Sequence, residues 1–116
     1  METIDLVKTI ETVLDDKKAQ QITLLDVQGR TSVCDYMIVV TGTSGRHLKA
    51  LSDYVVEKLD ESNIKPLGVE GDTGSDWVLL DLGDVLVHLM TQQARDYYQL
   101  EKLWSVPAAS ATQQPA

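Results

Sequence analysis

The residues best suited to chemistry lie in a glycine-rich turn, Gly42-Thr43-Ser44-Gly45. This turn follows an apolar, strand-like stretch and precedes a helical pattern, a position in which backbone amides can cradle a phosphate. It has neither the lysine and spacing of a P-loop nor a full dinucleotide-binding glycine pattern. A helix cap formed by Thr43 or Ser44 is the simpler interpretation.

A glycine-serine turn before a helix is also typical of nucleotidyltransferases. Those enzymes need two carboxylates two residues apart on a strand, so that both reach one magnesium ion from the same face. The residue two positions after Asp81 is Gly83, and Asp84 falls in the following turn. The carboxylate pair is absent, so the sequence predicts a protein that is not an enzyme and binds no cofactor. The alternative is a small nucleotidyltransferase-like enzyme that uses the Gly42–Ser44 turn with Asp81 or Asp84.

The histidines and the single cysteine give little support for a metal or catalytic site. Two histidines and one cysteine cannot complete a four-ligand zinc site without carboxylates, and no ligand spacing supports one. His47 falls in the first turn of a helix, where we expect a solvated side chain. His88 would be a general base only beside a nucleophile or an orienting acid, and its expected strand partner is Leu79. We interpret Cys34 as a buried, inert thiol in a protein of the reducing cytosol.

Two apolar stretches, 77–82 and 85–90, flank the dipeptide Gly83-Asp84. Glycine in the first turn position predicts a two-residue hairpin of type II′, and the turn fixes the register. One face then pairs apolar residues only and should be core: Leu82 with Val85, Leu80 with Val87, and Val78 with Leu89. The opposite face pairs Asp81 with Leu86, Leu79 with His88, and Trp77 with Met90. That mixture predicts a face that is either half covered by a helix or used for docking.

Trp77 is the strongest candidate for a binding residue on this second face. Tryptophan is enriched among interface residues whose truncation costs the most binding free energy. The alternative, that the last helix covers Trp77 as part of a core, stays open. Tyr97 and Tyr98 point in different directions on that helix, so at least one should reach the surface.

The remaining pattern predicts an α/β domain, a mixed β-sheet with flanking helices. The expected elements are a helix over 3–16, strands over 22–27 and 36–41, a helix from Leu48 to Leu59 ending at Asn63, a short strand near 67–69, the hairpin, and a helix over 92–104. Their order is α-β-β-α-β-β-β-α. Residues 1–105 form one domain, and the Pro-, Ala- and Gln-containing stretch 106–116 is predicted to be a disordered tail.

The charge balance restricts the partners of this domain. Among 116 residues, 18 are acidic and 10 basic, a formal net charge of −8. Binding to phosphates needs clustered Lys and Arg, and the longest basic run is Lys17-Lys18, so direct nucleic-acid binding is disfavoured. A basic partner would be attracted by this charge, although the charge could also serve only solubility. No stretch is apolar enough to span a bilayer and the N-terminus lacks a signal core, so we expect a cytoplasmic protein.

Motifs at fixed spacing run through nearly the whole domain, from 22 to 105. They comprise Leu25-Asp26-Val27-Gln28-Gly29, Asp35-Tyr36-Met37-Ile38-Val39, Gly42-Thr43-Ser44 with Arg46-His47, Gly68-Val69-Glu70-Gly71, Asp76 through Val85 with Val87-His88, and Arg95, Tyr98 and 100–104. Together they resemble the ribosomal silencing factors, also called the Iojap-like family.

This resemblance implies a nucleotidyltransferase-like fold that has lost its catalytic carboxylates. It further implies a translational repressor that binds the large ribosomal subunit through ribosomal protein L-fourteen. There it would block joining of the small subunit and lower translation when nutrients are short. Family members often form homodimers when free.

Combining the resemblance with the hairpin and the charge, we expect one docking face with Trp77 and Tyr98 as its anchors. Carboxylates at its rim would meet basic groups of the partner. The candidate partner-binding residues are Trp77, Leu79, Asp81, His88, Met90, Arg95, Tyr98, Glu101 and Lys102.

Overall fold

The computed structural model describes residues 1–71 and 74–105, with the backbone alone at 104 and 105. The elements are α1 (Thr3–Asp16), β1 (Gln20–Asp26), β2 (Tyr36–Gly42), α2 (Gly45–Asp60), β3 (Gly68–Glu70), β4 (Trp77–Asp81), β5 (Val85–Thr91), α3 (Gln92–Tyr98) and α4 (Leu100–Ser105). The α/β class is confirmed, and the predicted order holds as far as α3. The predicted tail lies outside the described residues.

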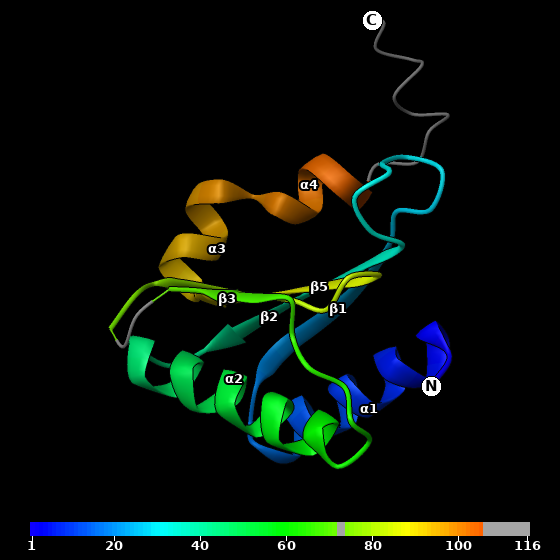
Figure 1. Ribbon diagram of the computed structural model, residues 1–116. Coiled ribbons are helices and arrows are strands. Elements are labelled where there is room, and N and C mark those ends of the chain that lie inside the picture. Colours follow the sequence, from blue (N-terminus) through cyan, green and yellow to red (C-terminus); the bar gives the residue numbers. More distant parts are fainter. Residues whose placement is uncertain (72–73, 106–116) are drawn as a thin grey trace, which may run out of the picture.

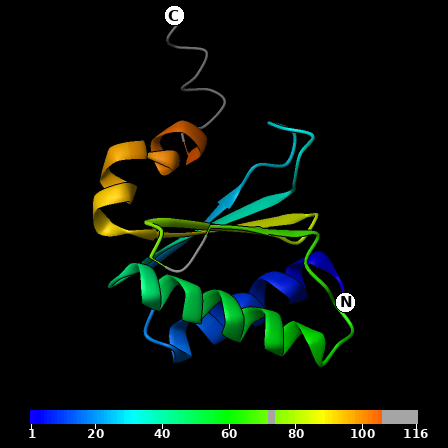
Figure 2. The ribbon, with the colours of Figure 1, turned by 60° about the vertical axis from the view of Figure 1, so that its left-hand side comes forward.

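The strands form one mixed sheet in the order β1-β2-β5-β4-β3. The β2–β5 pair is parallel and the other neighbours are antiparallel. Helices α1 and α2 cover one face, and α3 and α4 lie on the other (Figures 1 and 2). Within the described ranges, no helix has both the length and the apolar character needed to cross a bilayer.

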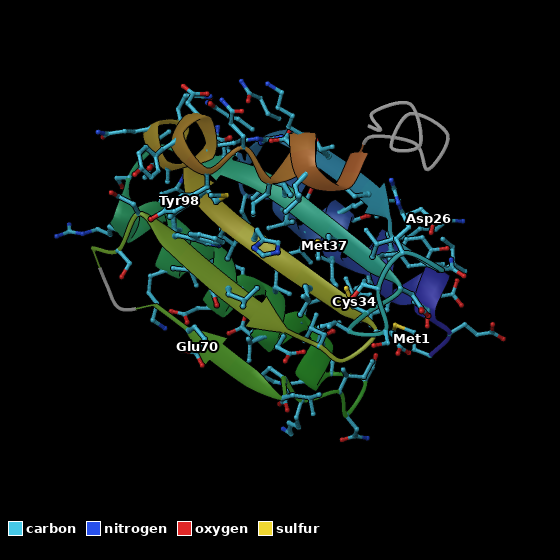
Figure 3. The ribbon with its side chains drawn as sticks, turned by 90° about the horizontal axis from the view of Figure 1, so that it is seen from above. Met1, Asp26, Cys34, Met37, Glu70 and Tyr98 are labelled. Atoms are coloured by element: carbon cyan, nitrogen blue, oxygen red, sulfur yellow. The ribbon has the colours of Figure 1, made fainter. Side chains whose placement is uncertain are left out.

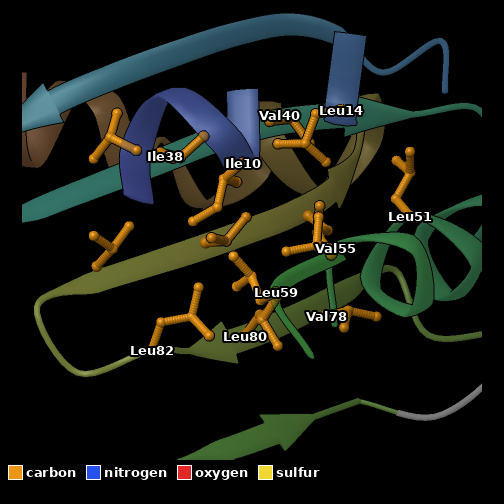
Figure 4. Close-up of a cluster of buried hydrophobic side chains, with 14 of the residues drawn as sticks. Ile10, Leu14, Ile38, Val40, Leu51, Val55, Leu59, Val78, Leu80 and Leu82 are labelled. Carbon is orange, nitrogen blue, oxygen red and sulfur yellow. The ribbon is translucent and has the colours of Figure 1, made fainter. Parts of the chain in front are cut away.

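The larger core lies between the sheet and the α1–α2 layer (Figure 4). Residues at helical spacing supply its outer side, with Ile10 and Leu14 from α1 and Leu51 and Val55 from α2 all fully buried. Side chains of β2, β4 and β5 supply the inner side. This layer fixes the sheet and leaves its opposite face to carry the candidate site.

The β4–β5 hairpin has the predicted register. Residue pairs Val78–Leu89 and Leu80–Val87 face each other, and Leu82 N donates to Val85 O at 2.9 Å across the turn. Gly83 has φ +87°, the conformation that favours glycine at this turn position. All six residues assigned to the core face are buried: Val78, Leu80, Leu82, Val85, Val87 and Leu89.

A second, smaller core lies on the other face of the sheet, beneath α3 and α4. It contains buried residues of β1, β2 and β5 together with Ala94, and Leu100 packs against it. Cys34 belongs to this core and is buried, as predicted. Burial and the nearby carboxylates, Asp35 first among them, raise the pKa of its thiol, which keeps the thiol protonated and inert.

The prediction of one helix over 92–104 is wrong. Helix α3 ends at Tyr98, Gln99 takes the left-handed conformation with φ 52° and ψ 48°, and α4 starts at Leu100. Gln99 N still donates to Arg95 O, so the break is an ordered helix end. The turn brings Glu101 back towards Arg95, six positions earlier. On a continuous helix these two side chains would point about 120° apart.

Candidate partner-binding face

The candidate site is the part of the second sheet face that α3 and α4 leave open. Helix α3 packs on β5 and β2, and α4 packs on β1. Seen from above, β3 and β4 lie beside the two helices and not beneath them (Figure 3). We call the side of β4 and β5 on this sheet face the hairpin face. Its β4 residues Trp77, Leu79 and Asp81 are partly exposed, and its β5 residues Leu86, His88 and Met90 are buried.

Trp77 lies where the hairpin face meets α3. Its indole packs partly against the second core and contacts the Tyr98 ring, with ring centroids 4.6 Å apart and planes tilted by 51°. The indole Nε1–H donates to His88 Nδ1 at 3.1 Å. Trp77 is thus partly covered and partly exposed, and its role in partner binding stays a prediction.

A groove of about 390 Å³ opens between the start of β4 and α3. Its lining residues are Ser75, Asp76, Trp77, Gln93, Ala94, Tyr97 and Tyr98. Tyr97 and Tyr98 are 78% and 51% exposed, so both tyrosines reach the surface. Aromatic walls beside the exposed carboxylate of Asp76 form a recess that suits an inserted side chain of a partner.

Arg95 is buried and does not belong to the exposed surface, contrary to the prediction. Its exposure is 5%, and all five guanidinium N–H directions meet an acceptor. Nη1 donates to Gln21 O at 2.6 Å and to Thr41 Oγ1 at 2.9 Å, and Nη2 donates to Thr23 Oγ1 at 2.9 Å. The other two bonds go to Glu101, from Nε at 2.8 Å and Nη2 at 2.7 Å.

The Glu101 carboxylate is consequently paired with Arg95 inside the chain. Both of its oxygens accept from Arg95, and these hydrogen bonds lower the pKa of its carboxyl group. Its side chain is still 32% exposed, so a rim contact of Glu101 with a partner stays a prediction, made by a carboxylate that is already paired. Lys102 next to it is exposed and keeps its predicted accessibility.

The remaining predicted residues divide between surface and support. Leu79 and Asp81 are partly exposed on β4, and Asp81 Oδ1 accepts from Gly83 N at 2.9 Å. Met90 is fully buried and His88 is 6% exposed, so neither offers a contact surface to a partner, contrary to the prediction. Both lie on β5, whose place inside the sheet puts them beneath neighbouring side chains.

His88 has no free basic nitrogen. Because Nδ1 accepts from Trp77, the neutral ring must carry its hydrogen on Nε2. Burial lowers the His88 pKa to about 4. The arrangement orients an indole and does not suit general-base catalysis.

The glycine-rich turn is occupied by contacts within the chain. Ser44 caps α2 by accepting from His47 N at 3.2 Å, and Thr43 N donates to His47 Nδ1 at 3.0 Å. A Cβ on Gly45 would lie 2.6 Å from the backbone of Gly74, which shows how closely a loop approaches this turn. The helix-cap interpretation is confirmed by the Ser44 bond.

His47 is not the solvated residue that its position predicts. Its Nδ1 accepts from the turn, and its Nε2 lies 3.1 Å from Lys17 O, at the end of α1. The side chain thus links the two helices of the first layer. Elsewhere, the described part of the chain has no group of three or more His, Cys, Asp or Glu residues placed to hold a metal ion.

Comparison with known proteins identifies the family of this chain. A family model described as "Ribosomal silencing factor during starvation" matches residues 1–115. The chain belongs to this family. Ribosomal silencing factors of Haemophilus influenzae and Chromobacterium violaceum are 40% and 43% identical to it, over 86% and 90% of this chain and 98% and 85% of their own.

Solved structures of similar chains have the same fold. A crystal structure from Chromobacterium violaceum superposes with a TM-score of 0.87 at 43% identity, covering 90% of this chain and 88% of the other. One from Bacillus halodurans gives 0.78 at 34% identity, covering 88% of this chain and 95% of the other. The bacterial relatives are named as silencing factors and not as enzymes. The two solved structures thus share the fold described above, a mixed sheet with helices on both faces.

Proposed function

We propose that this silencing-factor chain binds the large ribosomal subunit through ribosomal protein L-fourteen and blocks joining of the small subunit. Translation would fall as a result when nutrients are limited. The observation that carries the proposal is the contact between Trp77 and Tyr98 at the border of an uncovered sheet face. Half-buried aromatic residues beside a groove have the features of binding hot spots.

The charge of the chain supports a protein partner of basic character. A formal charge of −8 attracts basic groups over several ångströms, and Asp76 and Asp81 carry part of that charge beside the aromatic pair. Bare RNA is a poor partner for such a surface, since phosphates need clustered Lys and Arg. We further propose that the protein acts in the cytoplasm and that the free chain forms homodimers.

The test mixes the purified protein with isolated small and large subunits and separates the products by sedimentation. We expect the protein to travel with the large subunit and the joined ribosome to be depleted. Trp77→Ala should weaken binding by about 2 kcal/mol, roughly thirtyfold. Tyr98→Ala should weaken it in the same direction.

Tyr54→Ala is the matched control for Tyr98→Ala. Tyr54 is 41% exposed, and it lies on α2, across the sheet from the hairpin face. Its loss should leave sedimentation unchanged. Protein that stays at the top of the gradient while subunits join normally would refute the proposed function, and a Tyr54 effect equal to that of Tyr98 would refute the proposed face.

A further inference from the structure

His88 occupies a position where an aliphatic residue would be expected. It lies on β5 between Val39 of β2 and Leu79 of β4, its partners on the two neighbouring strands. Its neighbours on the same face of β5, Leu86 and Met90, are apolar and buried. A leucine here would continue the second core without burying a polar group.

The imidazole carries an unmet hydrogen-bonding group. Among the described side chains, those of residues 1–71 and 74–103, His88 Nε2 is the single buried nitrogen or oxygen that lacks a partner. Because Nδ1 accepts from Trp77, the atom left unpaired is an N–H donor. A buried donor without an acceptor costs free energy of folding, so the benefit of a histidine must come from its other nitrogen.

That other nitrogen restricts the indole of Trp77. Its Nε1–H bond to Nδ1 is 3.1 Å long, and the two ring centroids lie 5.7 Å apart. Tyr98 contacts the indole as well, at 4.6 Å between centroids. The indole is therefore held by a ring contact from α3 and a directional bond from β5, which reduces the conformational freedom that it could lose on binding.

We propose that His88 is a positioning residue that orients Trp77 for docking through Nδ1 and makes no contact with the partner itself. This inference rests on the proposed docking function of Trp77. It assigns to the buried histidine a role that an apolar residue of similar size cannot fill.

Two variants separate orientation from packing. His88→Leu fills the space but provides no acceptor, whereas His88→Asn places Oδ1 near the position of Nδ1 and can accept from the indole. We expect His88→Leu to weaken binding to the large subunit about tenfold, the value of one hydrogen bond, mainly through faster dissociation. His88→Asn should recover most of that loss. Urea unfolding of both variants checks that each is folded.

The indole Nε1–H signal of Trp77 in nitrogen-15 NMR gives a readout that packing alone would not move. The second indole, from Trp104, is distinguished with a Trp77→Phe variant. We expect His88→Leu to move the Trp77 signal towards that of a free indole and to speed its exchange with water. The signal in His88→Asn should stay close to that of the wild type.

A double-mutant comparison completes the test. Trp77→Phe keeps a ring but removes Nε1–H, so adding His88→Leu to it should cause no further loss of affinity. A full additional loss would overturn the inference, as would normal binding by His88→Leu when Trp77→Ala is defective. If the wild type itself fails to bind the large subunit, the proposed function is refuted and the docking role of His88 with it. An additional loss in the double mutant, or normal binding by His88→Leu, would refute only the role of His88.

Discussion

Arg95 and Glu101 join α3 to α4 through two parallel hydrogen bonds of 2.8 and 2.7 Å. The same guanidinium reaches β1 and β2, and it therefore ties the second helical layer to the edge of the sheet. Arg95→Ala would leave the Glu101 carboxylate and three further acceptors without their donors. We expect a loss of about 3–5 kcal/mol in the free energy of unfolding, measured by urea denaturation.

Arg95→Lys should be intermediate, because an ammonium has three donors in place of five and cannot pair with a carboxylate in the same planar way. The control is Lys49→Ala, which breaks the exposed pair with Asp53. It should change stability by less than about 1 kcal/mol. Equal effects of Arg95→Ala and Lys49→Ala would contradict the role assigned to Arg95.

The burial of His88 predicts a loss of stability in mild acid. Its pKa is about 4 in the folded chain, against the ordinary 6.5 expected on unfolding, so the unfolded chain binds the proton first. Stability from this group is complete above pH 6.5 and is lost as the pH falls towards 4, a total on the order of 3 kcal/mol. Urea denaturation at several pH values in this window measures the slope.

The matched variant for this slope is His88→Leu, which removes the titrating group. Protonation of Glu101 also lowers the free energy of unfolding in acid. Because its pKa lies below the ordinary 4.5 of a glutamate, this loss falls mainly below pH 4.5. A slope between pH 6.5 and 5 that survives in His88→Leu would show that another group is responsible.

The backbone of Gly74 leaves no room for a side chain at Gly45, the first residue of α2. An added Cβ would lie 2.6 Å from the Gly74 backbone, so Gly45→Ala should destabilise the chain by about 1–3 kcal/mol. Gly68→Ala is the control, since a Cβ there meets nothing within 4 Å. Thermal unfolding of both variants tests this, and equal midpoints would contradict the observed contact with the loop.

Electrostatic attraction predicts a salt-dependent association rate with the large subunit. Added salt screens the net charge of −8 and should slow association, while dissociation changes less. Surface-based kinetics over a series of salt concentrations measures both rates. Association that does not depend on salt would remove the electrostatic support for a basic partner.

The sequence predicted the features that depend on local spacing. Gly83 determined the hairpin turn, and the turn determined every pair of β4 and β5. Ser44 at the end of a strand-like stretch indicated a helix cap, and the cap is present. Such features could be derived because short-range geometry and period-two alternation decide them.

The missed features depend on contacts that no local pattern encodes. Arg95 and Glu101 are six positions apart, a spacing that does not bring side chains together on a helix, so neither the pair nor the break at Gln99 was predicted. The acceptors from β1 and β2 lie more than fifty positions away in the chain. His88 was placed correctly on its strand, but its bond to Trp77 depends on how the two rings pack.

The Gln21 carbonyl that Arg95 binds belongs to a residue 74 positions earlier in the chain, with positive φ at an irregularity of β1. During synthesis this carbonyl emerges long before its partner, and α3 cannot be tied down until Arg95 and Glu101 have both been made. An incomplete chain therefore lacks the layer that positions Tyr98 beside Trp77. A chain that ends before Glu101 would have all five strands of the sheet and the first helical layer but not the docking face proposed above.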